Sequence, residues 1–296
     1  MKIFFFFKIF FISLNLFSQR SIELRVDNDL YFSNDEYYSS GVFIKYEKKI
    51  DSDKEIGKPK VISWVLAQKI YNPLKRFSDD VSDFDYPYGG WLYLENTIQT
   101  QIKKNFFFKK GVQFGLTGDA SLARWIQNNY HDIFLGISKM PWTDQVPQSL
   151  HLNIILNLNL ITNISDKTNL VTNLNSFLGT QKISSGIKLG LNYGRFIVEN
   201  SDFFNSLSKK KLMAFYFGFD LDNFFHDYMN QGSLFKNNAP FTIKIKTLRY
   251  NLKSGFSLKI RNWKITCIYN QFSRDNIKQF KKYHKVLNLS LKHFFN

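Results

Sequence analysis

The second half of the chain is a series of segments in which apolar and polar residues alternate, each segment about ten residues long or a little longer. These segments cover residues 150–161, 169–178, 186–198, 212–221, 242–259, 264–272 and 285–295. Alternation with a period of two indicates β-strands, and about ten residues is the length that a tilted strand needs to cross a bilayer. Loops rich in Asn, Ser, Asp and Lys separate the segments. This rhythm predicts a transmembrane β-barrel.

The first half of the chain adds five segments of the same kind. They cover residues 22–26, 42–49, 61–71, 90–102 and 106–116, with loops at 50–60 and 72–89. The total is about twelve strands, an even number within the range of closed antiparallel barrels. Aromatic residues near strand ends are expected to form girdles at the two membrane interfaces. These residues are Trp64, Tyr71, Trp91, Tyr93, Trp263 and Tyr283.

The alternative fold is a secreted, water-soluble β-sandwich. Its strands average about five or six residues and are interrupted by more Gly and Pro. This chain has 6 Pro and 15 Gly among 296 residues, and 44% of its residues are hydrophobic. The long strands favour an all-β, transmembrane antiparallel barrel of about twelve strands, to which one short helix is added.

Residues 1–18 have the pattern of a secretory signal peptide. Lys2 and Lys8 lie around an apolar run, and Ser18 and Gln19 follow it, which places cleavage near Ser18. Residues 19–296 then form one outer-membrane barrel domain.

The net charge of +16 implies an anionic partner, unless it only solvates the surface. Export argues against nucleic acid and favours membrane phosphates. The single cysteine, Cys267, excludes an internal disulfide and a multi-cysteine metal site.

Residues 115–145 are the part of the sequence that looks helical. Apolar residues recur there at intervals of three and four, at Leu122, Trp125, Ile126, Ile133 and Phe134. We expect Asp119 to cap the start of this helix. Gln127 and His131 are four residues apart, so both side chains address the same point in space. Taken alone, the helix equally suits a simple packing role against a sheet, with His131 on the surface.

Three blocks in this half of the chain resemble a known family. DNDLYFSNDEYYSSG, from residue 27, is similar to E-N-D, a short gap, T-D, two residues and Y-T-x-G. DYPYGGWLYL, from residue 85, is similar to D-R-P-Y-A-G-W-L-Y. GLTGDASLARWIQNNYHDIFLG with PWTDQV, from residue 115, is similar to G-x-x-G-P, V-Q-N, two residues, H, then G-W-x-x-Q. In this order the blocks resemble the outer-membrane lipid A 3'-O-deacylases, the LpxR family.

The resemblance implies a twelve-stranded barrel whose catalytic centre lies on the outer-leaflet side, between the barrel wall and a short helix. There the family removes an acyloxyacyl chain from lipid A by calcium-dependent ester hydrolysis. The family's catalytic residues fall on Asn28, Asp29, Ser39 and His131. Ser39 replaces a threonine and Gly89 replaces an alanine. A family lysine falls in the loop after the third strand, where Lys75 or Arg76 takes its substrate-binding role together with Gln127.

Ester chemistry agrees with these roles. Hydrolysis needs a base to activate water, and a histidine near its natural pKa suits this purpose. The oxyanion needs a cation or amide donors, and the oxygen ligands of Asn28 and Asp29 favour Ca²⁺ over a soft metal. We therefore expect a monomeric enzyme of the bacterial outer membrane that binds Ca²⁺, lipid A or lipopolysaccharide, and outer-membrane lipids, with no nucleic-acid partner. Lys103, Lys104, Lys109 and Lys110 either meet lipid phosphates or lie at the opposite end of the barrel. The alternative is a non-enzymatic barrel, either a pore or an inactive family member.

Overall fold

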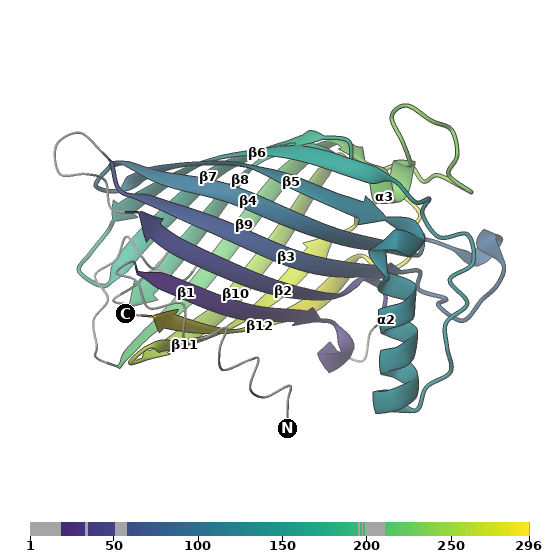
Figure 1. Cartoon of the computed structure of the whole chain (residues 1–296), viewed down its shortest axis with the longest axis horizontal. Coiled ribbons are helices and arrows are strands. Elements are labelled where there is room, and N and C mark those ends of the chain that lie inside the picture. The colour runs from purple at the N-terminus through teal and green to yellow at the C-terminus, as the bar shows by residue number, and fades with distance from the viewer. Residues whose placement is uncertain are drawn as a thin grey trace, which may run out of the picture.

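The computed structural model describes residues 19–32, 35–50, 58–194, 196, 198 and 211–295, so the predicted signal peptide lies outside the described residues. Within this part, twelve strands form a closed antiparallel barrel (Figure 1). Each strand pairs with its neighbours in sequence, and β1 closes the barrel by pairing with β12. Closure leaves no strand edge in the bilayer, where an unpaired backbone group would be costly. The predicted fold class is confirmed.

The strands are nine to sixteen residues long. They are β1 (Arg20–Asn28), β2 (Tyr37–Ile50), β3 (Lys60–Asn72), β4 (Gly89–Lys103), β5 (Phe106–Thr117), β6 (Leu150–Asn163), β7 (Thr168–Gly179), β8 (Lys182–Gly194), β9 (Leu212–Asp227), β10 (Leu248–Ile260), β11 (Trp263–Ser273) and β12 (Tyr283–Phe295). Several predicted boundaries were wrong: residues 242–247 precede β10, β8 ends at Gly194, β9 continues to Asp227, and β2 begins at Tyr37. Asn192 bonds Phe196 O (2.7 Å) and Val198 N (3.0 Å), which holds both residues off the strand.

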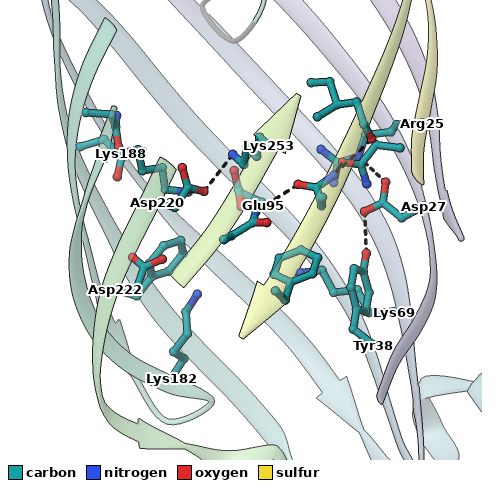
Figure 2. Close-up of a pocket in the computed structure, with 18 of the residues that line it drawn as sticks. Arg25, Asp27, Tyr38, Lys69, Glu95, Lys182, Lys188, Asp220, Asp222 and Lys253 are labelled. Carbon is teal, nitrogen blue, oxygen red and sulfur yellow. Dashed lines mark hydrogen bonds and ion pairs between the residues drawn. The ribbon is translucent and has the colours of Figure 1, made fainter. Parts of the chain in front are cut away.

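The outer face of the barrel is apolar and the inner face is polar, as a bilayer requires. Leu24, Val42 and Leu66 point outward and are each more than 40% exposed in the free protein. Charged side chains fill the interior and surround a cavity of about 700 Å³ (Figure 2). Lys253 lies 2.9 Å from Asp220 there. Ion pairs and hydrogen bonds therefore hold much of the interior.

The aromatic girdle prediction is half right. Trp64, Trp263 and Tyr283 are 45%, 49% and 46% exposed and lie on the outer face. The prediction is wrong for Tyr71, Trp91 and Tyr93, which line the internal cavity. Their strand parity turns them inward, because successive side chains of a strand alternate between its two faces.

One end of the barrel carries the short helices, and the strand ends near both termini lie at the other end (Figure 1). The short helices are η1 (Leu30–Phe32), η2 (Val81–Asp83), η3 (Gly118–Ser121), α2 (Ala123–Tyr130), η4 (His131–Leu135) and α3 (Tyr228–Gln231). Among the described residues, no helix is long and apolar enough to cross a membrane.

A buried polar network joins three loops over the lumen at the helix-bearing end. Asn276 donates to Asn230 Oδ1 (2.8 Å), and Asn230 donates to the Tyr86 hydroxyl (3.3 Å). Tyr86 in turn donates to Asp275 (3.3 Å), whose carboxylate lies 3.3 Å from Arg249. Asn276, Asn230 and Tyr86 are each at most 1% exposed. The network ties these three loops together through fully buried side chains.

Candidate active site

The start of α2 packs directly on the outside of the barrel wall (Figure 1). Gly90 of β4 allows this approach, because a Cβ at this position would lie 2.4 Å from Ala123 Cβ and 2.0 Å from Ser121 Oγ. Gln68 of β3 also donates to the Ser121 carbonyl (2.7 Å). The glycine in the second sequence block therefore sets the distance between the helix and the wall.

The predicted cap of this helix is wrong. The α-helix begins at Ala123, and the residue before it, Leu122, has a left-handed backbone (φ 61°) and makes no side-chain cap. Asp119 lies a turn earlier, where its carboxylate pairs with Arg124 (3.0 Å) and accepts a hydrogen bond from Gln145 (2.7 Å). Asp119 thus links the helix to the PWTDQV block.

The helical segment exposes its apolar face and buries its polar face, which is the reverse of a helix packed on a protein core. Trp125, Ile133 and Phe134 are 67%, 70% and 72% exposed, whereas Gln127 and His131 are 5% and 6% exposed. The polar residues face the barrel wall, and the apolar residues face outward. An outward apolar face is stable where its surroundings are lipid. The reading of His131 as a surface histidine is therefore wrong.

Asp35 is the residue to which His131 turns. His131 Nε2 lies 3.5 Å from Asp35 Oδ2, and Arg76 Nε lies 3.3 Å from the same oxygen. The other oxygen accepts hydrogen bonds from Ser39 Oγ (2.6 Å) and Asn72 Nδ2 (2.8 Å). The cluster thus joins β2, β3, the loop after β3, and α2.

Sequence reasoning missed Asp35 and Asn72. The sequence does contain a signal for Asp35, because this residue matches the aspartate of the T-D element in the first block. No role was predicted for it. Asn72 had no such signal, because it lies at the end of β3, outside every block. Gln127, which was predicted, reaches Asp35 Oδ1 at 3.5 Å.

Three buried acceptor atoms beside Asp35 have no hydrogen-bond partner among the described residues. They are His131 Nδ1, Gln127 Oε1 and Asn72 Oδ1. Buried acceptors are costly unless a donor reaches them, so this cluster suits a water molecule or a polar substrate group. His131 also stands at the change from α-helix to the π-helical turn η4, an irregularity frequent at functional sites.

Burial lowers the pKa of His131 below its usual 6.5. The negative charge of Asp35 opposes this effect, and the positive charge of Arg76 adds to it. The imidazole is therefore neutral at pH 7. A neutral imidazole whose Nδ1 is unpartnered can accept a proton.

Asp29 lies beside this cluster in the turn after β1 and is 1% exposed. Its carboxylate accepts a hydrogen bond from the Glu36 amide (2.9 Å) and one from Ser39 Oγ (3.4 Å). Burial raises the pKa of Asp29 to about 8; the Glu36 amide opposes this, and the charges of Asp35 and Glu36 add to it. Ser39 thus joins two carboxylates, Asp29 and Asp35, and Arg76 already supplies the positive partner of Asp35.

A cation beside Asp29 would meet oxygen ligands. The donor set contains the Asp29 carboxylate and the Ser39 hydroxyl, which suit a hard ion such as Ca²⁺. Asn28 is the next candidate, and its side-chain oxygen accepts the Leu30 amide at 2.6 Å. Among the described residues, no group of three or more His, Cys, Asp or Glu is arranged to hold a metal. Carbonyl oxygens and water would have to complete the shell.

The two basic candidates in the loop after β3, Lys75 and Arg76, have different partners in the structure. Lys75 pairs with Asp83 (2.5 Å) and is 63% exposed, whereas Arg76 reaches Asp35. The Tyr88 hydroxyl donates to the Arg76 carbonyl, and the Tyr88 ring stacks on Trp142 with 5.3 Å between centroids. The second and third sequence blocks thus position Arg76, which is the basic residue of this pair that contacts the cluster.

Asp85, the first residue of the second block, ties three loops together. It accepts hydrogen bonds from the Tyr37 hydroxyl (2.6 Å), the Leu74 amide (2.9 Å) and the Phe280 amide (3.1 Å). These bonds reach the first residue of β2, the loop after β3 and the loop before β12. The role of Asp85 is therefore to fix the loops that carry the site.

Four lysines considered for phosphate binding lie elsewhere. Lys103 and Lys104 are at the turn between β4 and β5, at the end of the barrel opposite α2. Lys109 lines the lumen. Lys110 is the next residue of β5, four residues after the strand begins at Phe106. None of the four lies near His131.

The fold and the cluster define an outer-membrane β-barrel with a buried histidine and carboxylates on the outside of its wall. A family model described as outer membrane protein LpxR matches residues 4–295, so the chain belongs to this family. The structure is similar to LpxR from Salmonella typhimurium, with a TM-score of 0.78 and 16% identity over 93% of this chain and 100% of that chain.

A more distant likeness is to the β domain of the Bordetella autotransporter BrkA. The TM-score is 0.50, with 9% identity over 93% of this chain and 98% of that chain. No curated protein sequence matches the chain. At these identities the solved structures support the barrel fold alone.

Proposed function

We propose that this protein is a lipid A deacylase that hydrolyses an ester-linked acyloxyacyl chain in the outer leaflet. The observation that carries the proposal is the place of His131, a buried neutral imidazole with an unpartnered Nδ1 between the barrel wall and a helix whose apolar face points outward. A substrate that reaches this site along the outer face of the barrel wall comes from the membrane. Lipid A is the ester-bearing glycolipid that the family resemblance names.

The barrel wall below the site suits the acyl chains of such a substrate. Val26, Val42, Ile44 and Leu66 point outward and are between 38% and 49% exposed. Val26 pairs with Val42, and Ile44 pairs with Leu66, so the four residues form one apolar strip across β1, β2 and β3. The strip leads along these strands to Ser39 and Asn72. Acyl chains lying on it bring their ester groups to the level of His131.

His131 acts as the general base. The tautomer with its proton on Nε2 turns this proton toward Asp35 and leaves Nδ1 free to take a proton from water. The water oxygen then attacks the ester carbonyl carbon, and the carbonyl electron pair moves to its oxygen. When the carbon–oxygen ester bond breaks, His131 returns the proton to the departing alkoxide. The products are the free acyloxyacyl acid and a hydroxyl group on lipid A.

Asp35 is the positioning residue of this mechanism. Its four polar neighbours fix its carboxylate, and the carboxylate orients the imidazole and stabilises the imidazolium that forms during attack. Bound Ca²⁺ supplies positive charge for the developing oxyanion. Asp29 is the residue that would hold this ion, with Ser39 and Asn28 as the neighbouring oxygen donors.

A direct assay tests the proposal. Detergent-purified protein is incubated with lipid A, with Ca²⁺ or with a chelator, and the products are analysed by mass spectrometry. We expect a free acyloxyacyl acid and a lipid A that has lost one acyloxyacyl chain, and we expect the chelator to stop the reaction. Intact lipid A in calcium-replete buffer refutes the proposal.

The alternative, a non-enzymatic barrel, makes a different prediction. The buried network over the lumen supports an enzyme over an open pore, because it packs Tyr86, Asn230 and Asn276 against one another across this end of the barrel. We expect the protein to show no steady ion conductance in a planar bilayer. A stable open channel favours the pore.

A further inference from the structure

The loop between β11 and β12 lies beside the candidate active site. Lys281 Nζ lies 2.7 Å from Glu36, whose amide bonds the Asp29 carboxylate. The Lys281 amide donates to the Tyr37 hydroxyl (3.3 Å), and Asp85 holds the amide of Phe280. These contacts fix the loop on the side of Asp29 away from α2, because β12 is the neighbour of β1 in the barrel.

The loop is held in one shape by its own hydrogen bonds. Arg274 donates to the carbonyls of Phe280 (2.9 Å) and Lys281 (3.3 Å). Asn276 Oδ1 accepts the amides of Lys278 (2.8 Å) and Gln279 (2.9 Å). Arg274 and Lys281 are therefore both occupied in building the loop. The other basic residues of the loop and of the start of β12 are free for another purpose.

These remaining residues are Lys278, Lys282 and Lys285, and all three are exposed. Among the described residues, none of them forms an ion pair. Phe280 stands between them and is 77% exposed, an unusual exposure for an aromatic ring held by an anchored backbone. Cations around an exposed aromatic ring fit the level of a membrane at which lipid headgroups begin.

The strand register places the three lysines near the site. Leu287 of β12 pairs with Asn28 of β1. Lys285 is two residues before Leu287, so it lies on the same outer face and one step beyond Asn28 toward the helix-bearing end. The acyl-chain strip on β1–β3 and the three lysines are thus neighbours on one side of the barrel. A lipid with its chains on the strip brings its headgroup toward the lysines.

We propose that Lys278, Lys282 and Lys285 form a docking surface for the phosphate groups on the sugar headgroup of the substrate. The proposal rests on the proposed function for the identity of the substrate. The surface acts on binding, since none of the three lysines contacts His131, Asp35 or Asp29. Its effect is to hold the headgroup while an ester reaches the catalytic cluster.

The test compares two substrates and two triple variants in detergent. The substrates are phosphorylated lipid A and the same lipid A after enzymatic removal of its phosphates. The first variant is K278Q/K282Q/K285Q. The second is K60Q/K103Q/K104Q, a control that removes the same charge from exposed lysines at the opposite end of the barrel. Heat-modifiable migration on gels verifies that both variants are folded.

For K278Q/K282Q/K285Q we expect KM for phosphorylated lipid A to rise on the order of 100-fold with kcat unchanged, because each of the three lysines near a phosphate contributes about 1 kcal/mol. KM for dephosphorylated lipid A should equal that of the wild type, and the control should match the wild type on both substrates. An unchanged KM overturns the proposal, and so does an equal loss on both substrates.

A binding measurement separates this surface from the proposed activity. If the wild type cleaves neither substrate, the proposed function fails, and binding of phosphorylated lipid A to the purified proteins then tests the surface alone. The proposal requires weaker binding by K278Q/K282Q/K285Q than by the control. Equal binding overturns it. An equal loss of affinity for phosphatidylglycerol micelles also overturns it, since the lysines would then contact any anionic lipid.

Discussion

Gly90→Ala is the substitution that tests how the barrel wall positions the catalytic histidine. The new methyl group would lie 2.4 Å from Ala123 Cβ, and ordinary contacts begin near 3.4 Å, so α2 must move outward by about 1 Å. His131 moves with the helix, away from Asp35 and Asn72 on the wall. A displacement of 1 Å at a catalytic group costs on the order of 100-fold in rate. We expect kcat for lipid A deacylation to fall by about this factor while the barrel remains folded.

A compensating substitution provides the control. Ala123→Gly removes the methyl group that Gly90→Ala strikes, and the Ser121 hydroxyl can rotate away from the remaining contact. The double variant should therefore recover part of the lost rate, and Ala123→Gly alone should show only the modest cost of a helical glycine, about 1 kcal/mol of stability. A Gly90→Ala enzyme with wild-type kcat refutes the idea that this contact sets the position of His131.

His131→Ala should leave a heat-modifiable barrel and lower the rate at least about 100-fold; near-normal activity removes the base assignment. Because the pKa of His131 is lowered, the wild-type rate at saturating calcium should fall only as pH drops below 6.5, and a midpoint above 7 contradicts this environment. Asp35→Asn should lower kcat and move this midpoint further down, since the charge of Asp35 raises the pKa of His131; an unmoved pH profile would make Asp35 merely structural. Protons and Ca²⁺ compete for Asp29, so calcium affinity measured by calorimetry should rise with pH to about 8 and then level off. Asp29→Ala should abolish this pH dependence, and excess calcium should restore part of the lost activity.

The barrel could be predicted from the sequence because strand periodicity is a local property. The alternation in residues 150–161 or 264–272 reports directly which face meets lipid, and no long-range information is needed. Residue type at a strand end, however, does not decide which face of the barrel wall an aromatic ring occupies. Tyr71, Trp91 and Tyr93 have the right residue type at strand ends, but their parity turns them into the lumen.

The helix shows where local pattern fails. The recurrence of Trp125, Ile133 and Phe134 correctly indicates an apolar helical face, but it does not say whether protein or lipid covers that face. In a water-soluble protein such a face is buried, and His131 would then be exposed. In a barrel the surrounding solvent is lipid, so the preference is inverted and His131 is buried.

The candidate site could be found in part because its residues lie in ordered blocks. Asp29, Ser39, Gln127 and His131 converge as the blocks suggested. Asn72 could not be found, since it contributes through the pairing of β2 with β3, a contact between strands that single-sequence periodicity does not specify. The choice between Lys75 and Arg76 likewise depended on the course of one loop.

The central claim is that His131 catalyses removal of an acyl chain from lipid A. The most direct test expresses the wild type and His131→Ala in the outer membrane of the same host and compares their lipid A by mass spectrometry. The account predicts that wild-type cells lose the mass of one ester-linked acyl chain, while His131→Ala cells, with equal amounts of folded barrel, keep it. Identical lipid A in the two strains, whether both intact or both deacylated, contradicts the account.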